Sequence, residues 1–175
     1  MFKFKKMFIP VIFSLVTCVM ADDSCFTRYE RVGDIWSQDI YYPFVSYSSF
    51  TDDSPEMSLH TRRPVFLHKE SEVAFHAVND NRPENTEGLF YGGLARIKVA
   101  EDGVYRVYLS NRTWVDFTDF ETATLVEPEG YLVQEECPSI KKMIEFKLVA
   151  DVDYVLQLSS STEPLVNMMI FKVDE

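Results

Sequence analysis

The chain has 175 residues, with 17 Lys or Arg against 28 Asp or Glu, and its formal net charge is −11. A chain this acidic repels the phosphates of nucleic acids and of anionic membrane surfaces, so its charge argues against nucleic-acid binding. After the first 21 residues no apolar run approaches the ~20 residues that a membrane-spanning helix needs, so we expect no membrane span.

The N-terminus has the pattern of a secretory signal peptide. An apolar run from Met7 to Met20 is followed by the small residue Ala21 and preceded by three cations, Lys3, Lys5 and Lys6. This pattern predicts cleavage after Ala21, a single domain over residues 22–175 and a periplasmic or secreted location. As an alternative, the stretch Leu15-Val16-Thr17-Cys18 resembles a lipobox, which would make Cys18 a lipidated N-terminus.

Two cysteines remain after that cleavage, Cys25 and Cys137. An even number of cysteines in an oxidising compartment favours a disulfide, so we predict that these two are bonded. The sequence around them has no CxxC motif and no cluster of His and Cys.

From Arg28 onward the sequence predicts short strands, because runs rich in Val, Ile, Tyr and Phe alternate with clusters of Pro, Asn, Asp and Gly. We expect at most a helical turn at Ser139–Lys142. In chain order the predicted strands are Tyr29–Trp36, Asp39–Tyr47, Pro64–His68, Glu72–Val78, Leu89–Ala100, Val104–Ser110, Trp114–Phe117, Ala123–Val126, Tyr131–Gln134, Met143–Val149, Tyr154–Ser159 and Val166–Val173.

Two stretches of the chain repeat one another. KVAEDGVYRVYLS at residues 98–110 matches KLVADVDYVLQLS at residues 147–159, and each predicts a hairpin of strand, acidic turn and strand. Period-2 alternation assigns an inward face to Ala95, Ile97, Val99, Tyr105, Val107, Leu109, Phe146, Leu148, Tyr154, Leu156 and Leu158. The fold class is therefore all-β, a two-sheet antiparallel β-sandwich of the jelly-roll type, with a closed β-barrel as the alternative.

The second half of the chain resembles small secreted β-sandwich proteins of proteobacteria that have no assigned role, and more faintly the pre-peptidase C-terminal domains of secreted enzymes. The resemblance covers about residues 92–173. It is carried by the runs Gly93–Phe117, with its Trp-Val-Asp strand, Cys137–Lys142 and Phe146–Ser159. Where those proteins often carry histidines before the cysteine, this chain has Gln134-Glu135-Glu136. The resemblance implies a secreted sandwich and supplies no functional residue.

Three candidate metal ligands are spaced by eight residues, His60, His68 and His76, and could converge if they lie on neighbouring strands. Acidic loops could instead hold calcium. They form two clusters, one of Asp80, Asn81, Glu84, Asn85 and Glu87 and one of Asp116, Asp119 and Glu121.

Aromatic residues supply the candidate ligand-binding site, because exposed rings beside carboxylates can stack on sugars. The candidate residues are Trp36, Tyr42, Trp114 and Asp116. We find no nucleophile elbow, phosphate loop or redox motif, so an enzyme is not favoured. The favoured hypothesis is a non-enzymatic protein that binds a protein or glycan partner in the cell envelope through its loops, chiefly Thr51–Glu56 and Asn79–Gly88, and its sheet edges. A carbohydrate-binding module and a metal-binding protein are the alternatives.

Overall fold

The computed structural model describes residues 30–38, 42–83, 88–134, 137 and 139–173. The predicted signal peptide, Cys18 and Cys25 lie outside them. The elements are α1 (Glu30–Trp36), β1 (Phe44–Val45), β2 (Arg63–Phe66), β3 (His68–Lys69), the 3-10 helix η2 (Glu70–Glu72), β4 (Tyr91–Lys98), β5 (Gly103–Leu109), β6 (Trp114–Asp119), β7 (Leu125–Val126), β8 (Pro128–Val133), β9 (Lys142–Leu148), β10 (Asp153–Ser161) and β11 (Leu165–Lys172). No helix in these ranges is both long and apolar enough to cross a bilayer.

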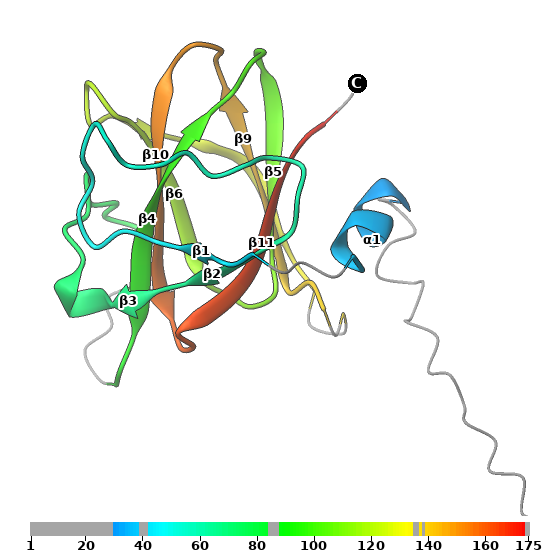
Figure 1. Cartoon of the computed structure of the whole chain (residues 1–175), viewed down its shortest axis with the longest axis horizontal. Helices are drawn as coiled ribbons and strands as arrows, with labels where there is room; N and C mark the ends of the chain where they lie inside the picture. The colour runs from blue at the N-terminus through cyan, green and yellow to red at the C-terminus, as the bar shows by residue number, and fades with distance from the viewer. Residues whose placement is uncertain (1–29, 39–41, 84–87, 135–136, 138, 174–175) are drawn as a thin grey trace, which may run out of the picture.

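The strands form two sheets that face one another, so the β-sandwich prediction is confirmed and the closed barrel is not what the chain forms (Figure 1). One sheet has the order β1-β2-β11-β5-β9-β8 and the other has the order β3-β4-β10-β6-β7. The antiparallel pairs β2·β11, β4·β10, β5·β9 and β6·β7 are those of a long hairpin rolled up on itself, which is the jelly-roll pattern. The pairing of β1 with β2 is parallel.

The two repeated stretches are not hairpins, which corrects the sequence-based prediction. The turn at Asp102 leads from β4 in one sheet to β5 in the other, and the turn at Asp151 leads from β9 back to β10. Each copy is therefore an arch across the sandwich, and the arches pair with one another: Lys98 lies opposite Asp153, and Val104 opposite Lys147. Because these two pairs occupy equivalent positions in the repeat, the arches are related by an approximate twofold axis.

The predicted inward face is confirmed, since all eleven residues assigned to it belong to the buried core between the sheets. Other members of this core come from the flanking strands, among them Val65, Val115, Phe117, Val166 and Met168. Side chains of one strand face alternately in and out, so a period-2 pattern was sufficient to orient these strands.

The segment that was predicted as a strand at Tyr29–Trp36 contains the helix α1 instead (Figure 1). Val32 and Trp36 are four residues apart and so lie on one face of this helix. Both are buried against Tyr108 and Met169 on the outer face of the six-stranded sheet. Packing against the sheet outweighs the strand preference of the β-branched and aromatic residues here.

Three further predicted elements differ. In the segment predicted as Glu72–Val78, Glu72 is the last residue of η2 and the rest is irregular, with the N–H groups of His76 and Ala77 bonded to the Gln157 side chain and not to a neighbouring strand. Of the strand predicted at Asp39–Tyr47, only β1 and an isolated bridge at Tyr47 form in the described residues. Ser139–Lys142 contains no helical turn, and Lys142 already begins β9.

Gly93 lies where β4 passes close to Ser46. A Cβ atom at position 93 would lie 2.0 Å from Ser46 Oγ and 2.5 Å from Ser46 Cβ. Ser46 cannot move easily, because it is buried and its N–H donates to Phe66 O at 3.0 Å. We expect Gly93→Ala to lower the free energy of unfolding by about 1–3 kcal/mol.

Ser46→Gly removes the Oγ and Cβ atoms that a Cβ at position 93 would approach. The double variant Gly93→Ala/Ser46→Gly should therefore recover most of the free energy of unfolding that Gly93→Ala loses. Urea unfolding of the four proteins measures the coupling energy between the two positions. Additive losses would show that the close approach of Gly93 to Ser46 does not matter.

Candidate functional site

The candidate site is a cleft at one side edge of the sandwich, with a volume of about 550 Å³. It forms because β7 has two residues and pairs with Phe117 and Thr118, so among the described residues no strand pairs with the first half of β6 on that side. The chain then crosses to the other sheet at Pro128, the first residue of β8. The first half of β6 therefore faces β8 and the start of β9 across an open gap.

A local turn sets the position of Trp114 at the entrance to β6. Asn111 Oδ1 accepts hydrogen bonds from the Thr113 N–H at 3.1 Å and from Thr113 Oγ1 at 2.5 Å. This is an Asx turn, in which a short polar side chain takes the place of a backbone acceptor. Thr113 is buried, so the strand that follows it starts from a fixed point.

Asp116 links the cleft wall to the loop beside it. Its Oδ2 accepts a hydrogen bond from Trp114 Nε1 at 2.9 Å, and its Oδ1 accepts one from Asn79 Nδ2 at 2.8 Å. Asp116 is buried, and this burial raises the pKa of its carboxyl, while the two hydrogen bonds and the charges of Arg82 and Lys142 act in the opposite direction. These two hydrogen bonds hold the indole of Trp114 and the side chain of Asn79 in place.

Lys142 brings a cation into the same cleft. Its position on β9 has the parity of Ile144 and Phe146, so the side chain points into the gap between the sheets. Its Nζ donates to Thr113 O at 3.1 Å and lies 5.2 Å from the centre of the Trp114 ring. Burial lowers the pKa of this ammonium, and the charge of Asp116 opposes that effect.

The opposite wall of the cleft comes from β8. Tyr131 and Val133 face inward, because they lie opposite Ile144 and Lys142 in the register of β8 with β9. Tyr131 is nevertheless 73% exposed, and β8 is an edge strand of its sheet. Its ring is therefore the most accessible aromatic surface of the cleft.

The segment after η2 covers the outer face of the five-stranded sheet and ends at the cleft. The side chain of Gln157 accepts hydrogen bonds from the N–H groups of His76 and Ala77, at 2.6 and 3.1 Å, and donates to Ala77 O at 3.0 Å. This loop, which we define as the covering loop (residues 73–83), continues to Asn79 and Asn81 on the rim of the cleft. The hydrogen bonds of Gln157 therefore position the part of the covering loop that precedes Asn79 and Asn81.

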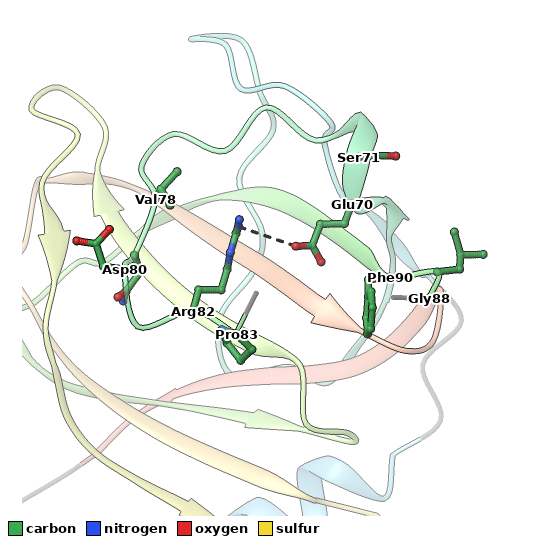
Figure 2. A pocket seen from close by; sticks show the side chains of 10 residues that line it. Glu70, Ser71, Val78, Asp80, Arg82, Pro83, Gly88 and Phe90 are labelled. Carbon is green, nitrogen blue, oxygen red and sulfur yellow. Dashed lines mark ion pairs between the residues drawn. The ribbon is translucent and has the colours of Figure 1, made fainter. Parts of the chain in front are cut away.

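A second cavity, of about 620 Å³, is lined by residues of η2, of the covering loop and of the segment 88–90 (Figure 2). Glu70 and Arg82 point toward one another across it, at 4.0 Å, and the Arg82 guanidinium lies over the Phe75 ring at 4.6 Å. Glu70 Oε2 also accepts a hydrogen bond from the Ser160 N–H at 2.6 Å. These contacts pair Glu70 with Arg82. Pro83 and Gly88 of the wall flank residues 84–87, which lie outside the described ranges.

The structure brings together two of the four predicted ligand-binding residues. Trp114 and Asp116 both line the cleft. Trp36 is 4% exposed and is a core residue behind the other sheet, so it offers no surface for a ligand. Tyr42 is 76% exposed but is not part of the cleft wall.

The three histidines have separate environments. The ring of His60 packs against Phe171 at 4.8 Å, His68 Nε2 lies 2.7 Å from Ser46 O, and His76 Nδ1 lies 3.0 Å from Thr118 Oγ1. Among the described residues no three His, Cys, Asp or Glu side chains form a group that could hold a metal ion. This result also covers the second acidic cluster, in which Asp119 Oδ1 accepts from the N–H groups of Glu121 and Thr122. In the first cluster, Glu84, Asn85 and Glu87 lie outside the described ranges.

The disulfide stays a prediction, because Cys25 lies outside the described residues. Cys137 is buried between α1 and the six-stranded sheet, beside Trp36 and Ile140. Its Sγ lies 4.0 Å from Ser139 Oγ.

The raised pKa of Asp116 predicts a pH dependence of stability. Its pKa in the folded state lies above its unfolded value of about 3.9. Its charge therefore costs stability near neutral pH, and this cost disappears as the pH falls below the folded pKa. We expect wild type to gain in free energy of unfolding relative to Asp116→Asn between about pH 7 and pH 4. Urea unfolding across this range tests it, and a difference that does not change with pH would contradict it.

Sequence reasoning missed Tyr131 and Lys142. Both carried a signal, since alternation along their strands places a tyrosine and a lysine on the inward face.

Comparison of the chain with protein-family models, curated proteins and solved structures finds no match. The function of the chain is therefore inferred from the geometry of the cleft.

Proposed function

We propose that this chain is a secreted or periplasmic binding protein without enzymatic activity, and that the cleft at Trp114 holds a glycan of the cell envelope. One observation carries the proposal: an exposed Tyr131 ring, the Trp114 indole and the polar pair Asp116 and Asn79 line the same cavity. The secreted location is supported by the cationic and apolar N-terminus of the sequence.

A sugar has one face of C–H groups and a rim of hydroxyls, so it needs an aromatic surface beside hydrogen-bonding groups. Since Lys142 lies over the Trp114 ring, the open stacking surface is Tyr131. Val133 and Ile144 add apolar wall below it.

The rim of the cleft supplies polar groups of several kinds, which suits a ligand with many hydroxyls. Arg112 and Lys142 are donors, Glu127 is an acceptor, and the amides of Asn79 and Asn81 are both. Charges of both signs surround the cleft, so we expect a ligand that is neutral or carries both charges.

The site is built largely on strands and on a loop that is hydrogen-bonded to the sheet. A preformed site loses less conformational entropy on binding than a flexible one. We therefore expect the cleft to bind its ligand without a large rearrangement of the sandwich.

Tryptophan fluorescence provides the test. Trp114 lies in the cleft and Trp36 lies behind the other sheet, so Trp36→Phe leaves one reporter at the site. The probes are polysaccharide fragments from a bacterial envelope, N-acetylglucosamine oligomers and glucose oligomers. We expect a saturable shift with at least one of them, retained in Trp36→Phe and lost in Trp114→Phe.

A pair of tyrosine variants controls for general effects of removing a ring. Tyr131→Ala should weaken binding at least about tenfold, equivalent to ~1.4 kcal/mol. Tyr42→Ala removes a ring of similar exposure outside the cleft and should leave binding unchanged. The absence of any shift at millimolar glycan, or equal effects of the two variants, would reject the proposal.

The processing of the N-terminus is tested by mass spectrometry of the protein from the periplasm. We expect a chain that begins at Asp22 and contains no free thiol, as the predicted Cys25–Cys137 disulfide requires. A lipid on Cys18 would establish the alternative cleavage, and two free thiols would contradict the disulfide.

A further inference from the structure

β8 forms one edge of the six-stranded sheet, next to β9. The Gln134 N–H donates to Lys141 O at 2.9 Å, so the backbone groups of residue 134 face β9. Along a strand these groups point alternately to the two sides, so those of Tyr131 and Val133 point away from β9. In the described part of the chain no strand pairs with that side of β8.

This edge is also apolar and accessible. Tyr131, Leu132 and Val133 are 73%, 36% and 39% exposed, and they follow one another in the strand. Edge strands usually avoid such a surface by means of proline, charge or a bulge. β8 has these protections at its beginning, with Pro128, Glu129 and a register shift before Gly130, and none of them at Tyr131–Val133.

The charge around the edge indicates what it would accept. Glu127 and Glu129 precede the apolar residues and are exposed. In the sequence Glu135 and Glu136 follow them, so acidic residues bracket the Tyr-Leu-Val run in a chain whose net charge is −11. A second copy of the chain would bring acidic residues opposite acidic residues, which opposes self-pairing.

We propose that β8 is a docking edge for an extended segment of a protein partner that is apolar at its centre and basic at both ends. The partner's backbone would pair with the free groups of Tyr131 and Val133, in the manner of strand addition. Basic residues of the partner would lie near Glu127 and Glu129, and the negative charge of the whole chain favours a basic partner, since charge complementarity speeds association and selects the partner. This proposal concerns the sheet edge and does not depend on the glycan proposal.

The experiment uses the whole secreted chain and a synthetic peptide of about nine residues, the length of a long strand, with the sequence Lys-Arg-Val-Thr-Val-Thr-Val-Arg-Lys. Hydrogen exchange followed by NMR reports the protection of individual amides. We expect saturable binding that slows exchange at the Tyr131 and Val133 amides at least about tenfold.

Val133→Pro removes the N–H of residue 133, which β9 does not use, and proline is tolerated on edge strands. Val133→Ala is its matched control, because it shortens the side chain and keeps the N–H. We expect at least about a tenfold loss of peptide affinity in the proline variant and a smaller loss in the alanine variant.

A peptide with the same centre and Glu in place of the Lys and Arg residues tests the charge. At low salt this acidic peptide should bind at least about tenfold more weakly than the basic peptide. Added salt should lower the affinity of the basic peptide. The proposal is overturned if the basic peptide does not bind, if binding leaves both amides unprotected, or if the acidic peptide binds equally well. Self-association that Val133→Pro abolishes would assign the edge to a second copy instead and would also overturn it.

Discussion

Phe117→Ala is expected to lower the free energy of unfolding by about 3–5 kcal/mol, the usual cost of truncating a fully buried Phe. Phe117 is fully buried at the centre of β6. Its ring makes T-shaped contacts with Phe146 of the six-stranded sheet and Tyr154 of its own sheet, at 4.8 Å and 6.2 Å between ring centres, so one side chain joins both sheets. Removing it leaves a cavity that neighbours held in two sheets fill poorly.

A loss of this size is a large part of the 5–15 kcal/mol that stabilises most domains, so the Ala variant could unfold during purification. Phe117→Leu keeps most of the volume, and we expect it to cost less than about 1.5 kcal/mol, as volume-conserving core substitutions do. Urea unfolding of the two variants and wild type gives both values. A loss below about 1 kcal/mol for Ala would mean that the contact between the sheets at Phe117 is not tightly packed.

The burial of this core was predictable from sequence because alternation is a local property. Tyr105, Phe146 and Leu156 each lie in a run with apolar residues at every second position, and this decides their face whichever strand lies beside them. The pairing of strands was not predictable in the same way. Asp102-Gly103 gives a turn whether the chain returns to its own sheet or crosses to the other, so the hairpin prediction was wrong while the turn and the inward faces were right.

The helix α1 shows a second limit of the sequence. With seven residues it is too short for a clear 3.6-residue pattern, and its contents favour a strand. The i, i+4 spacing of Val32 and Trp36 was the signal for a helix. It can be recognised only once the sheet surface that these two residues cover is known.

The candidate site was predicted in part. Trp114 and Asp116 were identified from an aromatic residue beside a carboxylate, and the loop beginning at Asn79 was expected to contribute to function. Trp36 has the same chemistry as Trp114 and is buried, because exposure depends on what packs against a residue. Tyr131 and Lys142 join the site through the register of β8 and β9 and the short length of β7, which are properties of the assembled sheets.

Gln157→Leu is expected to release the covering loop from the five-stranded sheet. The Gln157 side chain is buried and makes three hydrogen bonds with the backbone of His76 and Ala77. Leaving a buried backbone group without a partner costs about 1–3 kcal/mol, so the loop gains free energy by detaching into water. The Leu variant should show faster hydrogen exchange and cleavage by protease within residues 73–83, while the strands remain protected.

Gln157→Glu separates the acceptor role of this side chain from its other effects. A carboxylate can accept both N–H bonds, so the loop should stay on the sheet, while Ala77 O loses its donor and Asp116, opposite on β6, adds like-charge repulsion. We expect the covering loop to resist protease in Gln157→Glu but not in Gln157→Leu. Both variants should have a lower free energy of unfolding than wild type. Since Asn79 is carried by this loop, the Leu variant should also lose glycan affinity if the cleft binds sugar, although Gln157 does not line the cleft. Equal protease resistance of Leu and wild type would mean that the remaining contacts, His76 with Thr118 and Asn79 with Asp116, hold the loop without Gln157.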